Sequence, residues 1–258
     1  MPASAPDPLY ISSAQNPRVK HLLQLQQKSS ARRSEGLFVV EGHRELARVY
    51  CRVAPDVQCT PVLPEGIAAD ELIAVSPQVY ERMAYREGTE GVIAVVASPQ
   101  RSMESLPLGA SSLVVVLEGV EKPGNVGAVL RSADAAGADA VLLCDCPTDL
   151  YNPNLIRASI GAVFSVPCIE TTTEACIRFL RERGFSILTA QLQDSRLYYN
   201  TDMTGPTAIV LGTESVGLTT PWREAATSHI RIPMLGKLDS LNVSVSAAVL
   251  LFERSEER

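Results

Sequence analysis

The second half of the chain alternates between short apolar runs and segments with helical spacing of apolar residues. The run at 113–117 is continuously apolar, which is typical of a strand buried on both faces of a parallel sheet. A helix is predicted at 125–137, where apolar residues recur at helical spacing. Further strands are predicted at 140–144, 164–169, 186–190, 208–211 and 230–232, and further helices at 154–159 and 172–183. This alternation predicts an α/β fold whose parallel sheet is covered by helices on both faces.

The first part of the chain predicts a smaller α/β unit. A helix at 17–28 has Asn16 as its cap and Pro17 at its first position, and a polar, basic loop follows at 29–34. Strands are predicted at 37–40, 57–63, 72–75 and 91–97, and helices at 41–49 and 76–86. Between this unit and the next, the segment 98–112 is rich in Pro, Gly and Ser and lacks periodicity.

The sequence therefore predicts two domains joined by a linker. The first spans 10–98, the linker 99–112 and the second 113–258.

The end of the chain predicts an unusual last helix. A polar loop carrying Gly236, Asp239 and Ser240 leads into a helix that is apolar nearly all round. Its two apolar faces are formed by Leu241, Val245, Ala248 and Phe252, and by Val243, Ala247 and Leu250. Such a helix is normally buried, so we expect the chain end to pack inside its domain. The small polar residues Asn242 and Ser244 in this helix have a structural explanation, which is that their side chains bond their own backbone.

The composition is that of an ordinary globular protein, with 46% hydrophobic and 20% charged residues among 258. No apolar run is long enough to span a bilayer, and the Pro-rich start lacks the features of a secretory signal, so no membrane partner is expected. The six cysteines show neither a CxxC pair nor a His partner at zinc spacing. We therefore expect reduced thiols, no metal site and a cytoplasmic location.

The charge is unevenly distributed. The net charge of −6 argues against a general polyanion binder. Residues 10–52, however, hold eight Lys or Arg against three acids. This local excess indicates an anionic partner for the N-terminal unit, or else a basic face that is merely solvated.

The first glycine loop follows the strand at 113–117. Asn125 is placed to cap the next helix, and Arg131 projects from the side opposite its apolar stripe. Arg131 alone is also explained as a surface charge, although open α/β sheets bind ligands at such helix starts. The GxGxxG pattern is absent, so an oxidoreductase with a dinucleotide fold is not supported.

The second glycine loop follows the strand at 208–211. Gly212 and Gly217 have phosphate-loop spacing, but Leu218 stands where the essential Lys belongs, so nucleotide hydrolysis is rejected. What remains is a glycine turn with Glu214 at its tip. Taken alone, Glu214 is explained as a helix cap or as an acidic residue of a loop. The three histidines are scattered and lie outside these loops, which gives hydrolytic or metal chemistry little support.

Three segments, taken in order, resemble the three motifs of the SpoU (TrmH) family of RNA ribose 2'-O-methyltransferases, within the SPOUT superfamily. They are 125–133, 211–218 and 232–248, and the resemblance covers 113–254. The segments at 16–20 and 38–42 resemble, less specifically, the N-terminal substrate-binding domain of that family.

The resemblance implies a C-terminal domain with a trefoil knot, through which the last helix is threaded, and a homodimer with active sites near the interface. It also implies S-adenosylmethionine as cofactor, bound in the knot largely by backbone groups. The matching cofactor positions are Thr189, Ala190, Gly212, Ile232, Met234 and Leu241.

Catalysis would fall to the polar residues of the three motifs. These are Asn125, Arg131, Glu214, Ser240 and Asn242. In that family, the Arg that matches Arg131 is proposed to handle the proton that the ribose hydroxyl loses. Because an Arg is effectively always protonated, the same side chain is as well suited to orienting the 2'-oxygen or holding a phosphate.

RNA would be gripped by basic residues of the first domain. The candidates are Arg18, Lys20, Arg32, Arg33 and Arg44. Ribosomal RNA of the large subunit is favoured over transfer RNA, because the discrete first domain resembles those of members acting there. The rival function is a non-catalytic RNA-binding or ribosome-assembly protein of the same fold.

Overall fold

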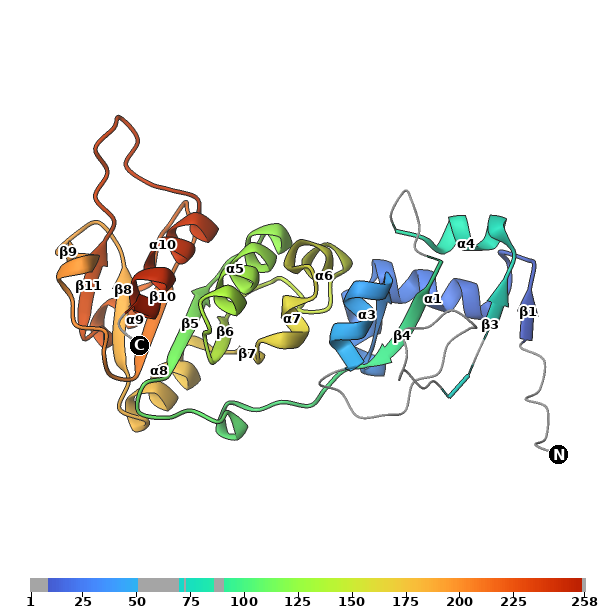
Figure 1. The fold of residues 1–258 in the computed structure, drawn as a ribbon, viewed down its shortest axis with the longest axis horizontal. Coiled ribbons are helices and arrows are strands. Elements are labelled where there is room, and N and C mark those ends of the chain that lie inside the picture. Colours follow the sequence, from blue (N-terminus) through green and yellow to red (C-terminus); the bar gives the residue numbers. More distant parts are fainter. Residues whose placement is uncertain (1–8, 51–69, 72, 86–90, 257–258) are drawn as a thin grey trace. The chain divides into compact units, whose positions relative to one another are not determined.

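A computed structural model describes residues 9–50, 70–71, 73–85 and 91–256 (Figure 1). Contacts divide the chain into two compact units, which are described separately below. One comprises Met1–Pro99 with Tyr151–Pro153, and the other Gln100–Leu150 with Asn154–Arg258. The strand expected at 57–63, Cys51 and Cys59 lie outside the described residues.

The second unit is built on a sheet of seven parallel strands in the order β7-β6-β5-β10-β8-β11-β9. The strands are β5 (Leu113–Glu118), β6 (Ala140–Cys144), β7 (Cys168–Thr171), β8 (Ser186–Ala190), β9 (Arg196–Leu197), β10 (Thr207–Leu211) and β11 (Ser228–Arg231). All six residues of β5 are buried, as its unbroken apolar run predicts. The expected parallel α/β fold is confirmed.

Helices cover both faces of this sheet. They are α5 (Pro123–Ala135), α6 (Pro153–Ser159), α7 (Ala162–Ser165), α8 (Thr173–Glu182), α9 (Thr220–Ala225) and α10 (Val243–Glu256), with short 3-10 turns η1 (Met103–Ser105) and η2 (Tyr198–Asn200). Phe179 of α8 and Trp222 of α9 join the core on one face, together with Val114 and Leu142. Helices α5 and α10 pack against each other, and α10 also contacts β10 (Figure 1).

Some local predictions for this unit were wrong. The expected strand at 164–169 is instead α7 followed by β7, because Ile160 and Gly161 turn the chain with positive φ and Pro167 delays the strand. Asn125 does not cap α5: the cap is Lys122, and Pro123 fixes the first turn two residues earlier than expected. The short elements β9 and α9 were not predicted.

The last helix, α10, is only partly as expected. Val243, Ala247 and Leu250 are buried, but Val245 is 47% and Phe252 48% exposed, so the second apolar face lies at the surface. The helix end is nevertheless deeply anchored. Arg254 is fully buried and its Nη2 donates to the carbonyl oxygens of Ser111, Thr204 and Gly205. These carbonyls immediately precede β5 and β10, so the chain end is tied to the start of the central strands.

The first unit contains two small sheets with helices. Strands β1 (Leu9–Ile11) and β3 (Ile73–Val75) pair in parallel, and β2 (Leu37–Glu41) and β4 (Ile93–Ala97) pair antiparallel. The helices are α1 (Pro17–Gln27), α2 (Ser29–Glu35), α3 (His43–Tyr50) and α4 (Pro77–Met83). Asn16 caps α1 as predicted, since its side chain accepts from the Arg18 N–H at 2.9 Å.

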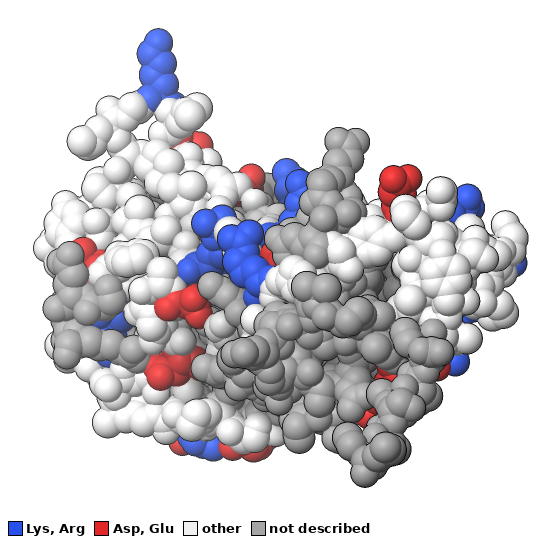
Figure 2. All heavy atoms as spheres, turned by 45° about the vertical axis from the view of Figure 1, so that its right-hand side comes forward, with Lys and Arg blue, Asp and Glu red and all other residues white. Residues whose placement is uncertain are grey.

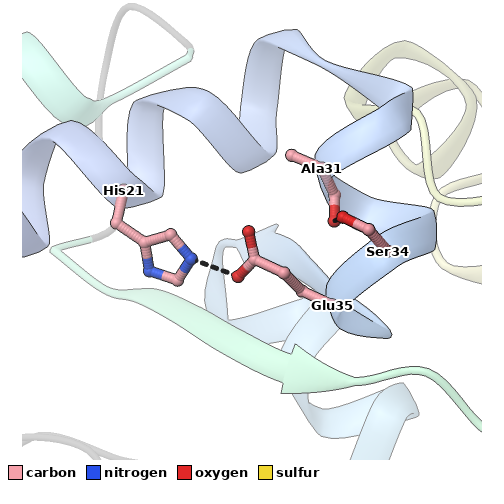
Figure 3. A network of polar contacts seen from close by, with 4 residues as sticks. All are labelled: His21, Ala31, Ser34 and Glu35. Atoms are coloured by element: carbon pink, nitrogen blue, oxygen red, sulfur yellow. Dashed lines mark hydrogen bonds and ion pairs between the residues drawn. The ribbon is translucent and has the colours of Figure 1, made fainter.

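The segment 29–34 is a helix, not the predicted loop, and Arg32 explains why. Arg32 is only 3% exposed, and its Nη1 donates to the carbonyl oxygens of Leu25 and Gln26 at the end of α1. The assignment of Arg32 to an RNA-binding surface is therefore wrong: its guanidinium satisfies orphan carbonyls of a helix terminus. Between the same helices, His21 Nε2 and Glu35 Oε2 face each other at 2.5 Å (Figure 3).

The four cysteines in the described parts of the chain are free thiols. Cys144, Cys168 and Cys176 are buried, and Cys146 is half-buried. Burial raises the pKa of Cys146 to about 11, and a hydrogen bond with Cys176, together with burial, raises the pKa of Cys144. Both thiols are therefore protonated near neutral pH and are poor nucleophiles. Among the described helices, none has the length and apolar character needed to cross a membrane.

We predict that Arg32→Ala destabilises the first unit by about 2–3 kcal/mol, because buried carbonyls lose a charged hydrogen-bond donor. Arg33→Ala is the matched control: Arg33 is exposed, and its loss should cost less than about 1 kcal/mol. Denaturation followed by circular dichroism reports on both units, whereas fluorescence of the single tryptophan, Trp222, reports on the second. Equal stability of the two variants would contradict this structural role.

Candidate cofactor pocket and active site

A pocket of about 390 Å³ lies at the carboxyl ends of β8, β10 and β11. Three loops form its walls: the segments 190–193, 211–218 and 230–241. Its volume lies within the range of roughly 300–1,000 Å³ that is typical of small-molecule sites. The carboxyl edge of a parallel sheet is also where open α/β folds bind their ligands.

The loop after β10 is closed by direct contact between two glycines. A Cβ added at Gly212 would lie 2.4 Å from the carbonyl carbon and oxygen of Gly217, so no side chain fits there. Gly217 has a φ of +74°, and Thr213 and Gly217 form an isolated β-bridge. These glycines therefore fold the loop tightly on itself and leave its backbone at the pocket wall.

Glu214, at the tip of this loop, joins three segments that are distant in sequence. Its Oε1 accepts from Asn242 Nδ2 at 2.6 Å, from Asn125 Nδ2 at 3.3 Å and from the Val243 N–H at 3.3 Å. Asn242 Nδ2 also lies 3.2 Å from Asn125 Oδ1. The structure thus brings together Asn125, Glu214 and Asn242, which the sequence placed in three separate motifs.

Asn242 serves both this network and its own helix. Its Oδ1 accepts from the Ser244 N–H at 3.0 Å and from Ser244 Oγ at 2.6 Å, at the start of α10. The local explanation of Asn242 is therefore confirmed, since its amide oxygen bonds its own helix. Its amide nitrogen bonds Glu214, and its catalytic role stays a prediction.

Two other candidates lie apart from the network. Arg131 is exposed on α5, and within the described residues its side chain makes no hydrogen bond or ion pair. It therefore keeps all its donors available for an incoming group. Ser240 lines the pocket, and its Oγ donates to Oδ1 of Asp239 at 3.3 Å, a second lining residue of the polar loop that precedes the last helix.

The pocket wall includes Ala190, Gly212, Ile232, Met234 and Leu241, five of the six expected cofactor positions. Thr189 is not in the wall: it is fully buried, and its Oγ1 lies 2.6 Å from His229 Nδ1. Gln191 was missed by sequence reasoning.

The Gln191 Oε1 atom is buried in the pocket wall, with no hydrogen-bond partner among the described residues. A buried acceptor without a partner is uncommon, which makes Gln191 a candidate for contact with a water molecule or a ligand group.

Across the described residues, no group of three or more His, Cys, Asp or Glu is arranged to hold a metal ion. Two lining arginines, Arg223 and Arg231, were not predicted, and Arg231 Nη1 donates to the carbonyl oxygen of Ser195. No signal in the sequence pointed to Arg223, because α9 itself was not predicted.

Four basic candidates of the first unit lie at its surface. Arg18, Lys20, Arg33 and Arg44 are exposed, and Arg18 forms an ion pair with Glu71. Figure 2 shows Lys and Arg side chains on the surface, with acidic residues between them. The exposed Lys20, Arg33 and Arg44 give the first unit positive charge at its surface.

Comparison with known proteins gives matches over both units. Residues 112–252 match the SpoU rRNA Methylase family, and residues 16–94 match the MRM3-like substrate binding domain. The chain is 34% identical to the 23S rRNA (guanosine-2'-O-)-methyltransferase RlmB of Pectobacterium atrosepticum, over 79% of this chain and 86% of that protein.

Solved structures of RNA methyltransferases are also similar to this chain. An RNA 2'-O ribose methyltransferase superposes with a TM-score of 0.79 at 37% identity, covering 96% of this chain and 99% of that one. The AdoMet-bound rRNA methyltransferase from Sinorhizobium meliloti gives a TM-score of 0.86 at 26% identity, covering 96% and 97%.

We predict that Gly212→Ala opens the loop after β10, because the added methyl group would overlap the Gly217 backbone. Hydrogen exchange of the amides at 212–218 should accelerate by at least about tenfold, which corresponds to 1.4 kcal/mol of local stability. Gly236→Ala is the control, since a Cβ there meets nothing within 4 Å. Unchanged exchange in Gly212→Ala would mean that the loop tolerates the close contact.

Proposed function

This chain belongs to the SpoU rRNA methylase family, and from that premise we propose that it transfers a methyl group from S-adenosylmethionine to a ribose 2'-hydroxyl of 23S ribosomal RNA. The substrate follows from relatives named as 23S rRNA methyltransferases. The single observation in the structure that carries the proposal is the Asn125–Glu214–Asn242 network beside the pocket.

S-adenosylmethionine would supply a methyl group activated on a sulfonium centre. The pocket residues fit such a ligand in four ways. Apolar side chains of Ile232, Met234 and Leu241 offer a surface for a flat base, and the backbone of Gly212 forms part of the wall. The unpartnered Gln191 Oε1 offers an acceptor, and the nearby carboxylates Glu214 and Asp239 suit a positively charged ligand.

The polar residues divide into orienting and reacting groups. Glu214 Oε1 already accepts three hydrogen bonds, so we assign Glu214 the task of ordering the loop and the two asparagines, not of taking a proton. Asn125 and Asn242 would then fix the substrate. Ser240 would hold the loop geometry through Asp239.

Arg131 has its full set of donors free within the described structure, which suits a guanidinium that clamps the ribose 2'-oxygen and the adjacent phosphate. Because methyl transfer requires the acceptor oxygen in line with the donor, such a clamp contributes mainly through orientation. Loss of the hydroxyl proton would be eased by the positive charge beside the developing oxyanion.

Lys20, Arg33 and Arg44 of the first unit would contact RNA phosphates, and the match to a substrate binding domain supports this assignment. We also infer a homodimer and a trefoil knot. The exposed apolar face at Val245 and Phe252 supports the dimer, and the anchoring of Arg254 beneath two central strands is compatible with the knot. A ribosomal RNA substrate favours a cytoplasmic location.

The first functional prediction is that the protein binds S-adenosylmethionine and its demethylated product, but neither NAD nor ATP. The reason is that the dinucleotide fingerprint and the phosphate-loop Lys are both missing beside an intact pocket. Isothermal titration calorimetry with each ligand is the measurement. Binding of ATP without binding of S-adenosylmethionine would overturn the proposed function, and binding without any methyl transfer would favour the non-catalytic RNA-binding role.

We next expect Arg131→Ala to lower the rate of methyl transfer by about two to three decades, equivalent to roughly 3–4 kcal/mol of transition-state stabilisation. Stability should change by less than about 0.5 kcal/mol, because Arg131 is exposed. Single-turnover transfer to RNA made in vitro, beside thermal melts, gives both values. Arg131→Lys should remain slow, since Lys lacks the planar fork. A near-normal rate in Arg131→Ala would remove this residue from the active site.

Finally, replacing Lys20, Arg33 and Arg44 together by Ala should weaken RNA binding and flatten its salt dependence. Each lost phosphate contact lowers the slope of log affinity against log salt by about 0.7–0.9. RNA binding measured between about 50 and 200 mM salt tests this. Affinity for S-adenosylmethionine serves as the control and should not change. An unaltered slope would identify these side chains as a solvated face.

A further inference from the structure

The Glu118 carboxylate is buried beneath the pocket loop and has no role in the site described so far. It ends β5, is only 5% exposed, and receives donors from two other elements. Its Oε2 accepts from the Thr219 N–H at 2.9 Å, and its Oε1 accepts from Thr219 Oγ1 at 2.5 Å and from Thr173 Oγ1 at 3.3 Å. A buried carboxylate is tolerated only where hydrogen bonds replace its hydration, which makes these three bonds structurally demanding.

Thr219 connects this carboxylate to the pocket. It follows Leu218, the last lining residue of the loop after β10, and it is the residue that precedes α9. Three residues after the start of α9, Arg223 also lines the pocket, while Trp222 beside it is fully buried in the core. The position of Thr219 therefore fixes both where the loop ends and where α9 enters the wall.

Glu118 also accepts a hydrogen bond from Thr173, a residue that does not line the pocket. Thr173 begins α8, is 4% exposed and is not a lining residue. The same carboxylate oxygen thus receives one hydroxyl from the pocket side and one from a purely structural helix. This arrangement supplies a matched pair of side chains for testing.

We propose that Glu118 is a positioning residue for the cofactor pocket, which acts through Thr219 to hold the loop 212–218 and α9 in the ligand-binding arrangement. The inference rests on the proposed function in so far as it takes S-adenosylmethionine as the ligand. If only a fraction of molecules holds the loop correctly, the observed affinity falls by that fraction. Loss of the Thr219 hydroxyl should therefore weaken binding even though Thr219 touches no ligand.

The test compares Thr219→Val with Thr173→Val, since each removes one hydroxyl from Glu118 and keeps a branched side chain of the same shape. We expect Thr219→Val to raise the dissociation constant for S-adenosylmethionine by about three- to tenfold. Thr173→Val should leave that constant within about twofold, but should lower the melting temperature more, because Thr173 is the more buried partner. Calorimetry, differential scanning and hydrogen exchange of 212–219 provide the readouts.

Glu118→Gln and Glu118→Leu complete the design. An amide of the same shape still accepts from the Thr219 N–H, and the hydroxyls can rotate to accept from it, so Glu118→Gln should bind within about threefold of the wild type. Glu118→Leu should lose about tenfold or more in affinity and show faster exchange at 212–219. If Glu118→Leu does not fold, the two Thr variants still decide.

Equal effects of Thr219→Val and Thr173→Val on cofactor affinity would overturn the inference, because Glu118 would then act only on general stability. Unchanged affinity in both variants would overturn it as well. Failure of the wild-type protein to bind S-adenosylmethionine is a different result: it would reject the proposed function, whereas normal wild-type binding with indifferent variants rejects only the role of Glu118.

Discussion

The loop that follows β10 is held by two carboxylates, and the geometry of the pocket depends on this double attachment. Glu118 bonds its end through Thr219, while Glu214 bonds its tip to Asn125 and Asn242. Between these points the backbone closes on itself at Gly212 and Gly217. The loop therefore joins the ends of β5 and β10 to the starts of α5 and α10, so that four elements distant in sequence share one edge of the sheet.

The two attachments differ in strength because they differ in burial. Glu214 and its asparagine partners are largely open to solvent, where a hydrogen bond contributes about 0.5–1.5 kcal/mol at most. Such a network can be rearranged by a substrate at little cost. The Glu118 side is buried against the core formed with Trp222 and α8, where loss of a partner leaves a desolvated charge. The structure thus combines a rigid support beneath the loop with an adaptable polar surface above it.

The sequence predicted the sheet well because doubly buried parallel strands have an unmistakable apolar run: β6 and β8 have the bounds expected, and β5 differs by one residue. It also singled out Asn125, Glu214 and Asn242 in three separate motifs, and the structure joins these three side chains by hydrogen bonds. Prediction from the sequence failed where tertiary contacts determine the role of a residue. Arg32 looked like a surface charge and is a buried helix cap, and the roles of Glu118 and Gln191 depend on partners or cavities that no local pattern records.

Arg131 also combines a rigid support with exposure to solvent. Its helix packs tightly against α6 at Gly127. A Cβ added there would lie only 2.6 Å from the Cβ of Ala158 and 2.8 Å from the backbone nitrogen of Ser159. One turn further along α5, Arg131 is exposed and takes no part in the Glu214 network. A guanidinium that is held on a rigid helix and makes no hydrogen bond or ion pair to the described part of the chain keeps its donors for an incoming group. In the proposed methyl transfer such a guanidinium would contribute charge and orientation, and both would depend on how firmly α5 holds it.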